Sequence, residues 1–180
     1  DKKVIGVTMP TKDLQRWNQD GENMKKELEA AGYEVDLQYA SNDVSTQVSQ
    51  LENQVANGCD LLVVASIDGS SLGEPLKQAK EKGIPVISYD RMVNNANTDL
   101  YISFDNRKVG EIMAQALVNA LPQGGDVFMI QGSSSDNNVQ MVKQGFDDML
   151  ADTDLHVVYE ANCDGWTAEL AAGYVEEALE

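Results

Sequence analysis

Apolar and polar residues follow two repeating patterns along the chain, one typical of strands and one typical of helices. Continuous apolar runs such as residues 61–65 indicate strands buried on both faces of a sheet, which favours parallel pairing. Between such runs, as along residues 44–55, apolar residues recur every three or four positions, which is the spacing of one helix face. The predicted strands are residues 4–9, 35–39, 61–65, 85–89, 100–104, 126–130 and 156–159. The predicted helices are residues 24–31, 44–55, 72–79, 109–121, 139–149 and 167–179.

Strands that alternate with helices predict an α/β fold with parallel sheets flanked by helices and joined by right-handed crossovers. We expect two lobes: residues 1–107 form an N-terminal lobe and residues 108–180 form part of a C-terminal lobe. The second lobe contains only two strand–helix units, and a sheet of that size buries little apolar surface. We therefore expect the 180 residues to be an incomplete part of a longer protein, with the C-terminal part missing.

The charge of the chain limits its partners. The formal net charge is −17. Such an acidic surface repels phosphate groups, so nucleic acid is not an expected partner, and adsorption on anionic membranes is disfavoured. No apolar run approaches the roughly 20 residues that span a bilayer. Residues 1–3 lead directly into the first predicted strand, so we expect that any export signal was removed or was never present.

Residues that could catalyse a reaction or bind a metal are sparse. Cys59 and Cys163 lie outside any CxxC pair and have no neighbouring histidine, so we expect two free, partly buried thiols and no zinc site. His156, the only histidine, lies within a predicted strand and is not expected to act as a base. No P-loop, GxSxG or GxGxxG sequence occurs, and residues 132–135 lack the lysine of a phosphate loop. We expect no enzyme activity, no metal and no cofactor.

The segments that follow the strands carry the candidate chemistry, because ligands of open α/β sheets bind beyond the carboxyl ends of the strands. These segments contain both tryptophans, Trp17 and Trp166, together with arginines, aspartates and asparagines. An indole offers a flat apolar surface to the C–H face of a sugar, and planar polar groups form charge-assisted hydrogen bonds with paired hydroxyls. The residue types favour a sugar held between one tryptophan from each lobe.

The same residues also have plain structural explanations. A single loop tryptophan is more often part of the core than a ligand platform. Asp90 and Arg91 could form a surface ion pair of little energetic weight, and Asn137 and Asn138 could cap the helix that follows them. Residues 104–106 could form a turn with an Asx hydrogen bond, or support a hinge between the lobes.

Several of these segments together resemble the periplasmic sugar-binding proteins of ABC transporters with the type I fold, in the cluster of xylose-binding and multiple-sugar-binding proteins. Any one segment alone is weak, but the Asp-Arg-Met, Phe-Asp-Asn and Asp-Gly-Trp elements together are specific, and the resemblance covers essentially all 180 residues. The matching segments are residues 16–17, 47–53, 86–92, 101–106 with 109–110, 136–138 and 164–166.

The resemblance implies roles for individual residues of the first lobe. Arg16 supplies a hydrogen bond to the sugar, and Trp17 supplies one stacking face. Asp90 and Arg91 grip the ring hydroxyls.

In the second lobe, the resemblance implies that Asn137, with Asn138 as its neighbour, contacts the sugar and that Trp166 stacks on the opposite face. Lys12, in the segment after the first strand, is a further candidate. The predicted sugar-binding residues are Lys12, Arg16, Trp17, Asp90, Arg91, Asn137 and Trp166.

The resemblance also implies a function. It implies a receptor that closes two lobes on one monosaccharide, D-xylose or a related aldose, and delivers it to the membrane permease of an ABC transporter. Such a receptor is expected to be a monomer when complete, and to be periplasmic or lipid-anchored outside the cytoplasm. The family continues beyond residue 180 with further sugar contacts and with the segments that complete the first lobe. The same fold also serves sugar-sensing ectodomains of kinases or chemoreceptors and effector domains of repressors, so these alternatives stay open.

Overall fold

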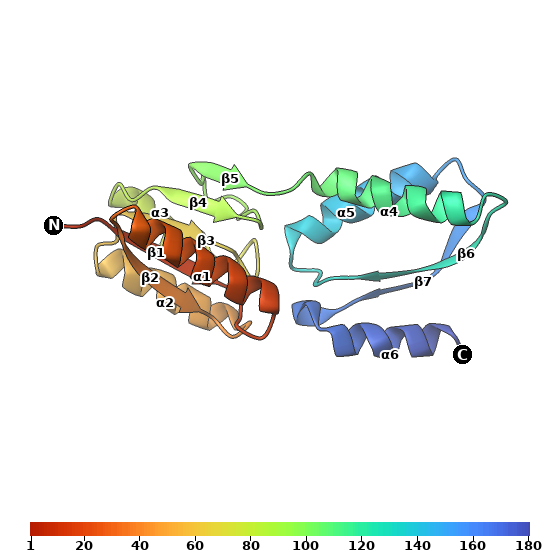
Figure 1. The fold of residues 1–180 in the computed structure, drawn as a ribbon, viewed down its shortest axis with the longest axis horizontal. Coiled ribbons are helices and arrows are strands. Elements are labelled where there is room, and N and C mark those ends of the chain that lie inside the picture. Colours follow the sequence, from red (N-terminus) through yellow and green to blue (C-terminus); the bar gives the residue numbers. More distant parts are fainter. The chain divides into compact units, whose positions relative to one another are not determined.

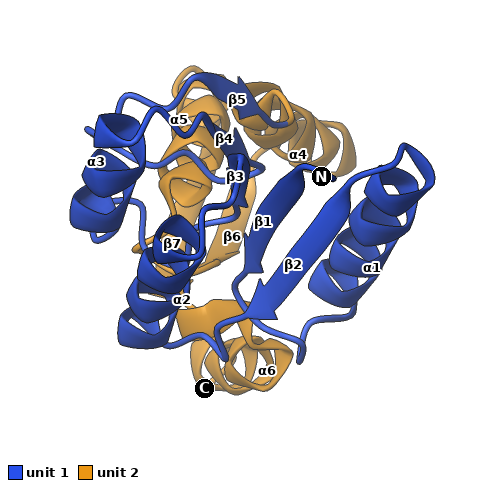
Figure 2. Cartoon of the chain, turned by 90° about the vertical axis from the view of Figure 1, so that its left-hand side faces the viewer, with its two compact units in different colours: residues 1–103 blue, residues 104–180 orange.

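The computed structural model describes residues 1–180 and divides into two compact units, unit 1 (residues 1–103) and unit 2 (residues 104–180) (Figure 2). Each unit contains parallel strands flanked by helices, which confirms the predicted α/β class. The assignment of residues 1–107 and 108–180 as the lobes of a longer protein stays a prediction.

Unit 1 is built on a five-stranded sheet with the order β2-β1-β3-β4-β5, in which every pair of neighbouring strands is parallel (Figure 1). The carboxyl ends of the strands therefore lie along one edge of the sheet. The strands are β1 (Val4–Met9), β2 (Glu34–Tyr39), β3 (Leu61–Val64), β4 (Val86–Tyr89) and β5 (Leu100–Ile102). The helices are α1 (Gln15–Ala30), α2 (Val44–Ala56) and α3 (Gly73–Glu81).

The sheet of unit 1 separates two apolar cores. Along β3, Leu62 and Val64 pack with residues of α2 and α3, whereas Val63 packs on the opposite face with β1 and α1. Figure 2 shows α1 on one side of the sheet and α2 and α3 on the other. Successive strand residues point to opposite faces, so a continuous apolar run is buried on both sides, as predicted for residues 61–65.

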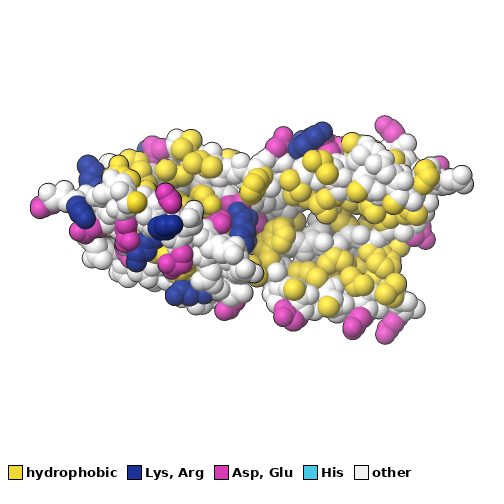
Figure 3. Space-filling model, viewed as in Figure 1, with side chains coloured by type: hydrophobic (Ala, Val, Ile, Leu, Met, Phe, Trp, Pro, Cys, Tyr) yellow, Lys and Arg dark blue, Asp and Glu magenta, His cyan; other side chains and the backbone are white.

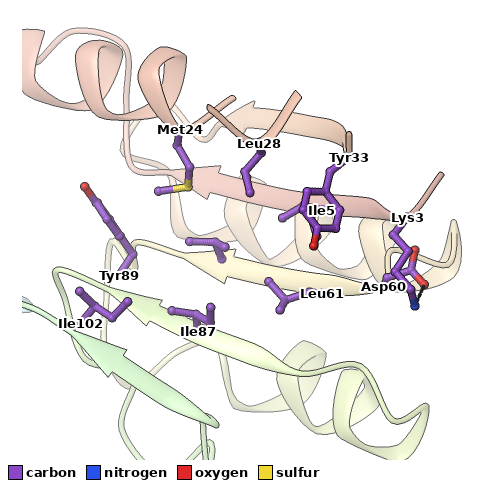
Figure 4. Close-up of a pocket in the computed structure, with 11 residues that line it drawn as sticks. Lys3, Ile5, Met24, Leu28, Tyr33, Asp60, Leu61, Ile87, Tyr89 and Ile102 are labelled. Atoms are coloured by element: carbon purple, nitrogen blue, oxygen red, sulfur yellow. Dashed lines mark hydrogen bonds and ion pairs between the residues drawn. The ribbon is translucent and has the colours of Figure 1, made fainter. Parts of the chain in front are cut away.

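The face of the sheet that α1 covers is hollowed into an apolar groove of about 440 Å³ (Figure 4). Met24 and Leu28 of α1 line one side, and Ile87 and Ile102 of the strands line the other. The groove contains none of the predicted sugar-binding residues. Its apolar lining offers few partners to a polyhydroxylated ligand.

Unit 2 has two parallel strands, β6 (Gly125–Gln131) and β7 (Leu155–Asn162). Helices α4 (Asn106–Ala120) and α5 (Asn137–Leu150) pack on one side of the strands, and α6 (Ala168–Ala178) lies on the other (Figure 1). Between β7 and α6 lies a short 3₁₀ turn, η1 (Asp164–Trp166). The helices α4 and α5 approach closely at Gly110 and Gly145, where an added Cβ would overlap the backbone of the facing helix.

The small sheet of unit 2 leaves large apolar side chains at the surface. Ile112 and Met113 of α4 and Val158 of β7 are all more than 45% exposed, and Figure 3 shows apolar atoms gathered beside α4 and α6. Two strands cannot bury both faces as a larger sheet does. No helix in the structure combines the length and the apolar character that crossing a bilayer requires.

Two elements near residue 105 differ from their predicted bounds. Strand β5 ends at Ile102 and not at residue 104, because its partner β4 ends at Tyr89, the residue that pairs with Ile102. Helix α4 begins at Asn106, where Asp105 caps it by accepting the N–H of Lys108 at 3.0 Å. Residues 104–106 therefore lead into a helix, and the hydrogen bond that the Asp105 side chain accepts is the cap of that helix. The role of this segment as support for a hinge stays a prediction.

The residue that caps α5 also differs from the prediction, and α6 has no side-chain cap. Asp136, and neither Asn137 nor Asn138, caps α5 by accepting the N–H of Asn138 at 2.9 Å. Thr167 occupies the N-cap position of α6, but its hydroxyl donates to the carbonyl oxygen of residue 164 and does not accept a helix N–H. Asp136 is the residue directly before the helix, so its side chain is placed to accept this N–H, whereas Asn137 and Asn138 already lie within the helix.

Candidate functional site

In unit 1, the guanidinium groups of two arginines lie over the indole ring of Trp17. The guanidinium carbon of Arg16 lies 4.5 Å from the ring centroid, and that of Arg91 lies 5.0 Å from it. Both distances are within the range of a cation–π interaction. Trp17 lies in the first turn of α1 and not in a loop as predicted, and it is only 2% exposed. It therefore serves as part of the core that fixes two cationic donors.

Asp90, which directly follows β4, accepts a hydrogen bond from Arg16. Its carboxylate accepts a 2.7 Å hydrogen bond from Arg16, whose Nε also donates to Asp20 at 3.3 Å. Partial burial by itself lowers the pKa of Arg16, but the hydrogen bond and charge of Asp90, followed by those of Asp20, outweigh it and raise the pKa above its ordinary value. Asp90 and Arg91 are buried, so the alternative of a surface ion pair between them is wrong.

Tyr89 extends this network away from Trp17. Its hydroxyl donates to Asp20 at 3.0 Å. Burial raises the pKa of Tyr89, and the hydrogen bond to Asp20 raises it further, so the phenol stays protonated and keeps donating. Asp20 therefore accepts from two groups, Arg16 and Tyr89, and it ties α1 to the end of β4.

The backbone of Asp90 adopts a rare conformation that places this network. Its φ is +63°, and the N–H of Arg91 bonds to the carbonyl oxygen of Tyr89 at 2.7 Å, which makes Asp90 the centre of a γ-turn. A non-glycine residue in this region costs about 1–3 kcal/mol. Neighbouring bonds hold the turn: Asp90 N–H donates to Ile102, and Ser103 donates to the Asp90 carbonyl, both at 2.7 Å. The tight turn lets Asp90 bind Arg16 while the next residue, Arg91, lies over Trp17.

Arg91 is held from a second direction by the segment after β3. Its Nη1 donates to the carbonyl oxygen of Ser66 at 3.2 Å, and the arginine is 6% exposed. Because a guanidinium carries five N–H donors in a rigid plane, contacts with Trp17 and Ser66 fix the directions of the others. Strands β1, β3 and β4 are neighbours in the sheet, so their carboxyl ends bring these groups together.

Lys12 lies apart from this network. Its ammonium is 5.0 Å from the ring centroid of Tyr39, beside a small polar hollow of about 270 Å³ that both residues line. The structure therefore joins Arg16, Trp17, Asp90 and Arg91 by direct contacts, while it gives Lys12 a different neighbour.

In unit 2, Trp166 is oriented by a buried carboxylate. Its Nε1 donates to Asp136 at 3.0 Å, and the other oxygen of Asp136 caps α5. Asp136 is 2% exposed, whereas Trp166 remains 39% exposed. Trp166 has a φ of +59°, a strained value for a bulky residue that the surrounding contacts must maintain. One edge of the indole is thereby fixed while part of its surface stays accessible.

Gly132, directly after β6, packs against the indole ring of Trp166. A Cβ at this position would overlap three atoms of the Trp166 ring, so only glycine lets the ring pack this closely on the backbone. The carbonyl of Gly132 accepts a 3.0 Å hydrogen bond from Asn162, at the end of β7. These contacts hold the ends of β6 and β7 and the indole of Trp166 together.

The two asparagines at the start of α5 differ in their surroundings. Asn138 is buried, and its side-chain oxygen accepts from Asn106 at 3.2 Å. Asn137 is half-buried in the same helical turn. The structure gives Asn138 a supporting contact to α4, which leaves Asn137 as the better candidate for contact with a ligand.

Sequence reasoning did not assign roles to four supporting residues. Asp136 was recognisable as a helix cap from its place before α5, and Gly132 stood next to a serine-rich segment. Nothing in the pattern indicated that Ser66 and Ser103 would bond to Arg91 and Asp90, because those contacts arise from strand neighbours far apart in sequence.

Comparisons with known proteins show the family of the chain. A family profile described as "Periplasmic binding protein domain" matches residues 5–180. The D-xylose-binding periplasmic protein of Escherichia coli is 40% identical over 179 residues, which are 97% of this chain and 54% of that protein. The multiple sugar-binding periplasmic receptor ChvE of Rhizobium radiobacter is 46% identical over 144 residues, which are 77% of this chain and 41% of that protein.

A solved structure gives the same result. The ABC transporter solute binding protein from Clostridium phytofermentans, with bound β-D-glucose, superposes with a TM-score of 0.82 at 52% identity, over 86% of this chain and 51% of that one. The chain spans about half the length of the curated relatives it matches. From the profile match and these relatives, the chain belongs to the periplasmic binding protein family.

Proposed function

We propose that this protein is the sugar receptor of an ABC transporter and that its ligand is D-xylose or a related aldose. The observation that carries the proposal is the packing of Arg16 and Arg91 on Trp17, with Asp90 bonded to Arg16, at the carboxyl ends of β1 and β4. That edge of a parallel sheet is where open α/β folds bind ligands.

The chemistry of this cluster matches a sugar. Arg16 and Arg91 supply planar N–H donors, and the carboxylate of Asp90 supplies acceptors, which together suit vicinal hydroxyl groups. Each group is already held by protein contacts, so little conformational entropy is lost on binding. Trp17 supports the two guanidinium groups in this proposal, and its direct stacking on the sugar stays a prediction.

Unit 2 is proposed to contribute Trp166 and Asn137. The indole of Trp166 is oriented by Asp136 and retains accessible surface, as a platform for the C–H face of a sugar requires. The amide of Asn137 offers both a donor and an acceptor to a hydroxyl.

The choice of sugar rests on the relatives. Two of them, from Escherichia coli and Haemophilus influenzae, are D-xylose-binding periplasmic proteins at 40% and 37% identity. The Clostridium structure at 52% identity contains β-D-glucose. D-xylose and D-glucose share the configuration of three ring hydroxyls and differ at C5, so one set of donors suits both. We place D-xylose first and D-glucose as its main competitor.

The relatives also support the proposed setting of the protein. Both are described as periplasmic, and the Clostridium homologue as a component of an ABC transporter. We accordingly propose a location outside the cytoplasm and delivery of the sugar to a membrane permease, with no bond of the sugar broken.

Isothermal titration calorimetry of the protein expressed from its complete gene tests this proposal. D-xylose is expected to bind one to one and more tightly than D-glucose, D-galactose or D-ribose. Tighter binding of D-glucose would overturn the choice of sugar but not the receptor. Absence of heat with every sugar, in protein shown to be folded by circular dichroism, would overturn the receptor itself.

A further inference from the structure

Helix α2 directs a row of glutamines at the sheet of unit 1. Gln47, Gln50 and Gln54 follow one another at intervals of three and four residues, so they share one helix face. Gln50 donates to the carbonyl oxygen of Tyr39 at 2.9 Å, and Gln54 donates to that of Asp36 at 3.1 Å. The row therefore satisfies backbone groups of the sheet from the helix side.

Gln47 holds the segment that follows β3. Its Nε2 donates to the carbonyl oxygen of Ala65 at 2.9 Å, and its Oε1 accepts the N–H of Ile67 at 2.9 Å. The side chain is 0% exposed. The two bonds lie on either side of Ser66, so they fix the orientation of both peptide planes that adjoin it. An unpaired buried N–H or C=O group is energetically costly, so these two hydrogen bonds hold the amide of Gln47 in one position.

The residue between these two bonds contacts the proposed ligand cluster. The carbonyl oxygen of Ser66 accepts the 3.2 Å hydrogen bond from Arg91 Nη1. Arg91 also lies over Trp17, so a rotation of the Ser66 carbonyl would turn the guanidinium on the indole. Binding geometry of this kind must be held to within about 0.5 Å to be productive.

We propose that Gln47 is a positioning residue, which acts through the backbone of Ser66 to set the direction of Arg91. The inference rests on the proposed sugar-binding function of Arg91. The side-chain amide of Gln47 hydrogen-bonds to the backbone of residues 65 and 67.

Gln54 provides a matched control on the same helix. It is also buried, at 1% exposed, and also bonds to two backbone carbonyls, those of Val7 and Asp36, at 3.4 and 3.1 Å. Those carbonyls lie within β1 and β2, away from the segment that holds Arg91. If Gln47 were only structural, Gln47→Met and Gln54→Met would have the same consequences.

The test compares these two variants in the protein expressed from its complete gene. The first readout is the ¹⁵N signal of the Arg91 guanidinium in the absence of sugar, assigned with Arg91→Lys. The second is calorimetric affinity for D-xylose and D-glucose. Gln47→Met is expected to shift the Arg91 signal and weaken binding about tenfold or more, whereas Gln54→Met changes neither, although both lower the urea midpoint.

The outcomes separate this inference from the proposed function. An unchanged Arg91 signal in folded Gln47→Met protein, or an equal shift in Gln54→Met, overturns the positioning role whether or not sugar binds. A shift in Gln47→Met alone supports it even when no sugar binds, in which case the receptor proposal fails separately. If Gln47→Met does not fold, Gln47→Asn replaces it, because it keeps an uncharged amide that is one methylene shorter and cannot hold both backbone groups in the same way. A smaller shift of the Arg91 signal is then expected, and no shift overturns the inference.

Discussion

Arg16 and Asp90 lie 74 residues apart in the chain, yet the guanidinium of the first donates a 2.7 Å hydrogen bond to the carboxylate of the second. The contact joins the first turn of α1 to the end of β4. Asp90 is 5% exposed, whereas the side chain of Arg16 is 45% exposed. The carboxylate of Asp90 is thus removed from water and is partly compensated by the positive charge of Arg16, whose side chain remains in contact with solvent.

The first prediction concerns the charge of Asp90. Asp90→Asn keeps the shape and tolerates the left-handed backbone, so it removes the charge with little added strain. We expect sugar affinity to fall tenfold or more, equivalent to about 1.4 kcal/mol, as measured by calorimetry. The free energy of unfolding should fall by only about 1 kcal/mol, well below the roughly 3–5 kcal/mol for breaking a fully buried pair, because Arg16 remains partly hydrated.

Asp90→Ala separates charge from backbone strain. Alanine lacks the local hydrogen bonding that lets Asp and Asn occupy a φ of +63°, so this variant should lose about 1–2 kcal/mol more stability than Asp90→Asn. Equal stability of the two variants in urea unfolding would contradict the strained turn. Wild-type sugar affinity in Asp90→Asn would show that the carboxylate of Asp90 does not take part in binding.

The second prediction concerns the bond between Asp136 and Trp166. Asp136→Asn keeps one oxygen for the cap of α5 but turns an N–H₂ group toward the indole N–H, which needs an acceptor. We expect Trp166 to become more mobile and sugar binding to weaken about tenfold. Fluorescence anisotropy of Trp166 in a Trp17→Phe background measures the mobility. Unchanged anisotropy would show that the ring is held by packing alone.

Much of the fold could be predicted because it follows from local patterns. The apolar run at residues 61–65 indicated burial on both faces, and β3 has that burial. The alternation of strands and helices gave the parallel connections and the edge at which the cluster lies. These features depend on neighbours along the chain, which the sequence displays directly.

The state of individual side chains depended on partners distant in sequence. Trp17 was expected in a loop as a stacking face, but its helical turn places it in the core under Arg16 and Arg91. That outcome requires the end of β4 to lie beside the start of α1. The positive φ of Asp90 was equally hidden, because aspartate has no strong preference for that conformation without its bonds to Ile102 and Ser103.

The third prediction concerns the space under Trp166. Gly132→Ala would drive a Cβ into the indole ring, so the ring must move or the end of β6 must shift. We expect sugar affinity to fall more than tenfold. The free energy of unfolding should change by less than the free energy of binding does. The control is Gly173→Ala in α6, where an added Cβ meets no atom within 4 Å. That variant should bind normally and gain about 0.5–1 kcal/mol from helix propensity. Normal binding by Gly132→Ala would show that the ring position is not needed.

The fourth prediction concerns the cap of α2, the helix that carries Gln47. Asp43 accepts the hydroxyl of Ser45 and the N–H of Thr46, each at 2.6 Å. The hydrogen bond from Ser45, followed by that from Thr46, lowers the pKa of Asp43 below its ordinary value. Because the folded pKa is depressed, the stabilisation is present above the unfolded pKa of about 3.9 and is lost as pH falls through the folded pKa.

The comparison with Asp43→Asn isolates this effect, because asparagine caps a helix without titrating. We expect the stability of the natural protein relative to Asp43→Asn, measured by urea unfolding, to be constant above about pH 5 and to decline below about pH 4. Ser45→Ala removes the largest cause of the pKa shift, so the decline should then be smaller. A difference that does not change with pH would mean that the carboxylate contributes no more to α2 than a neutral cap.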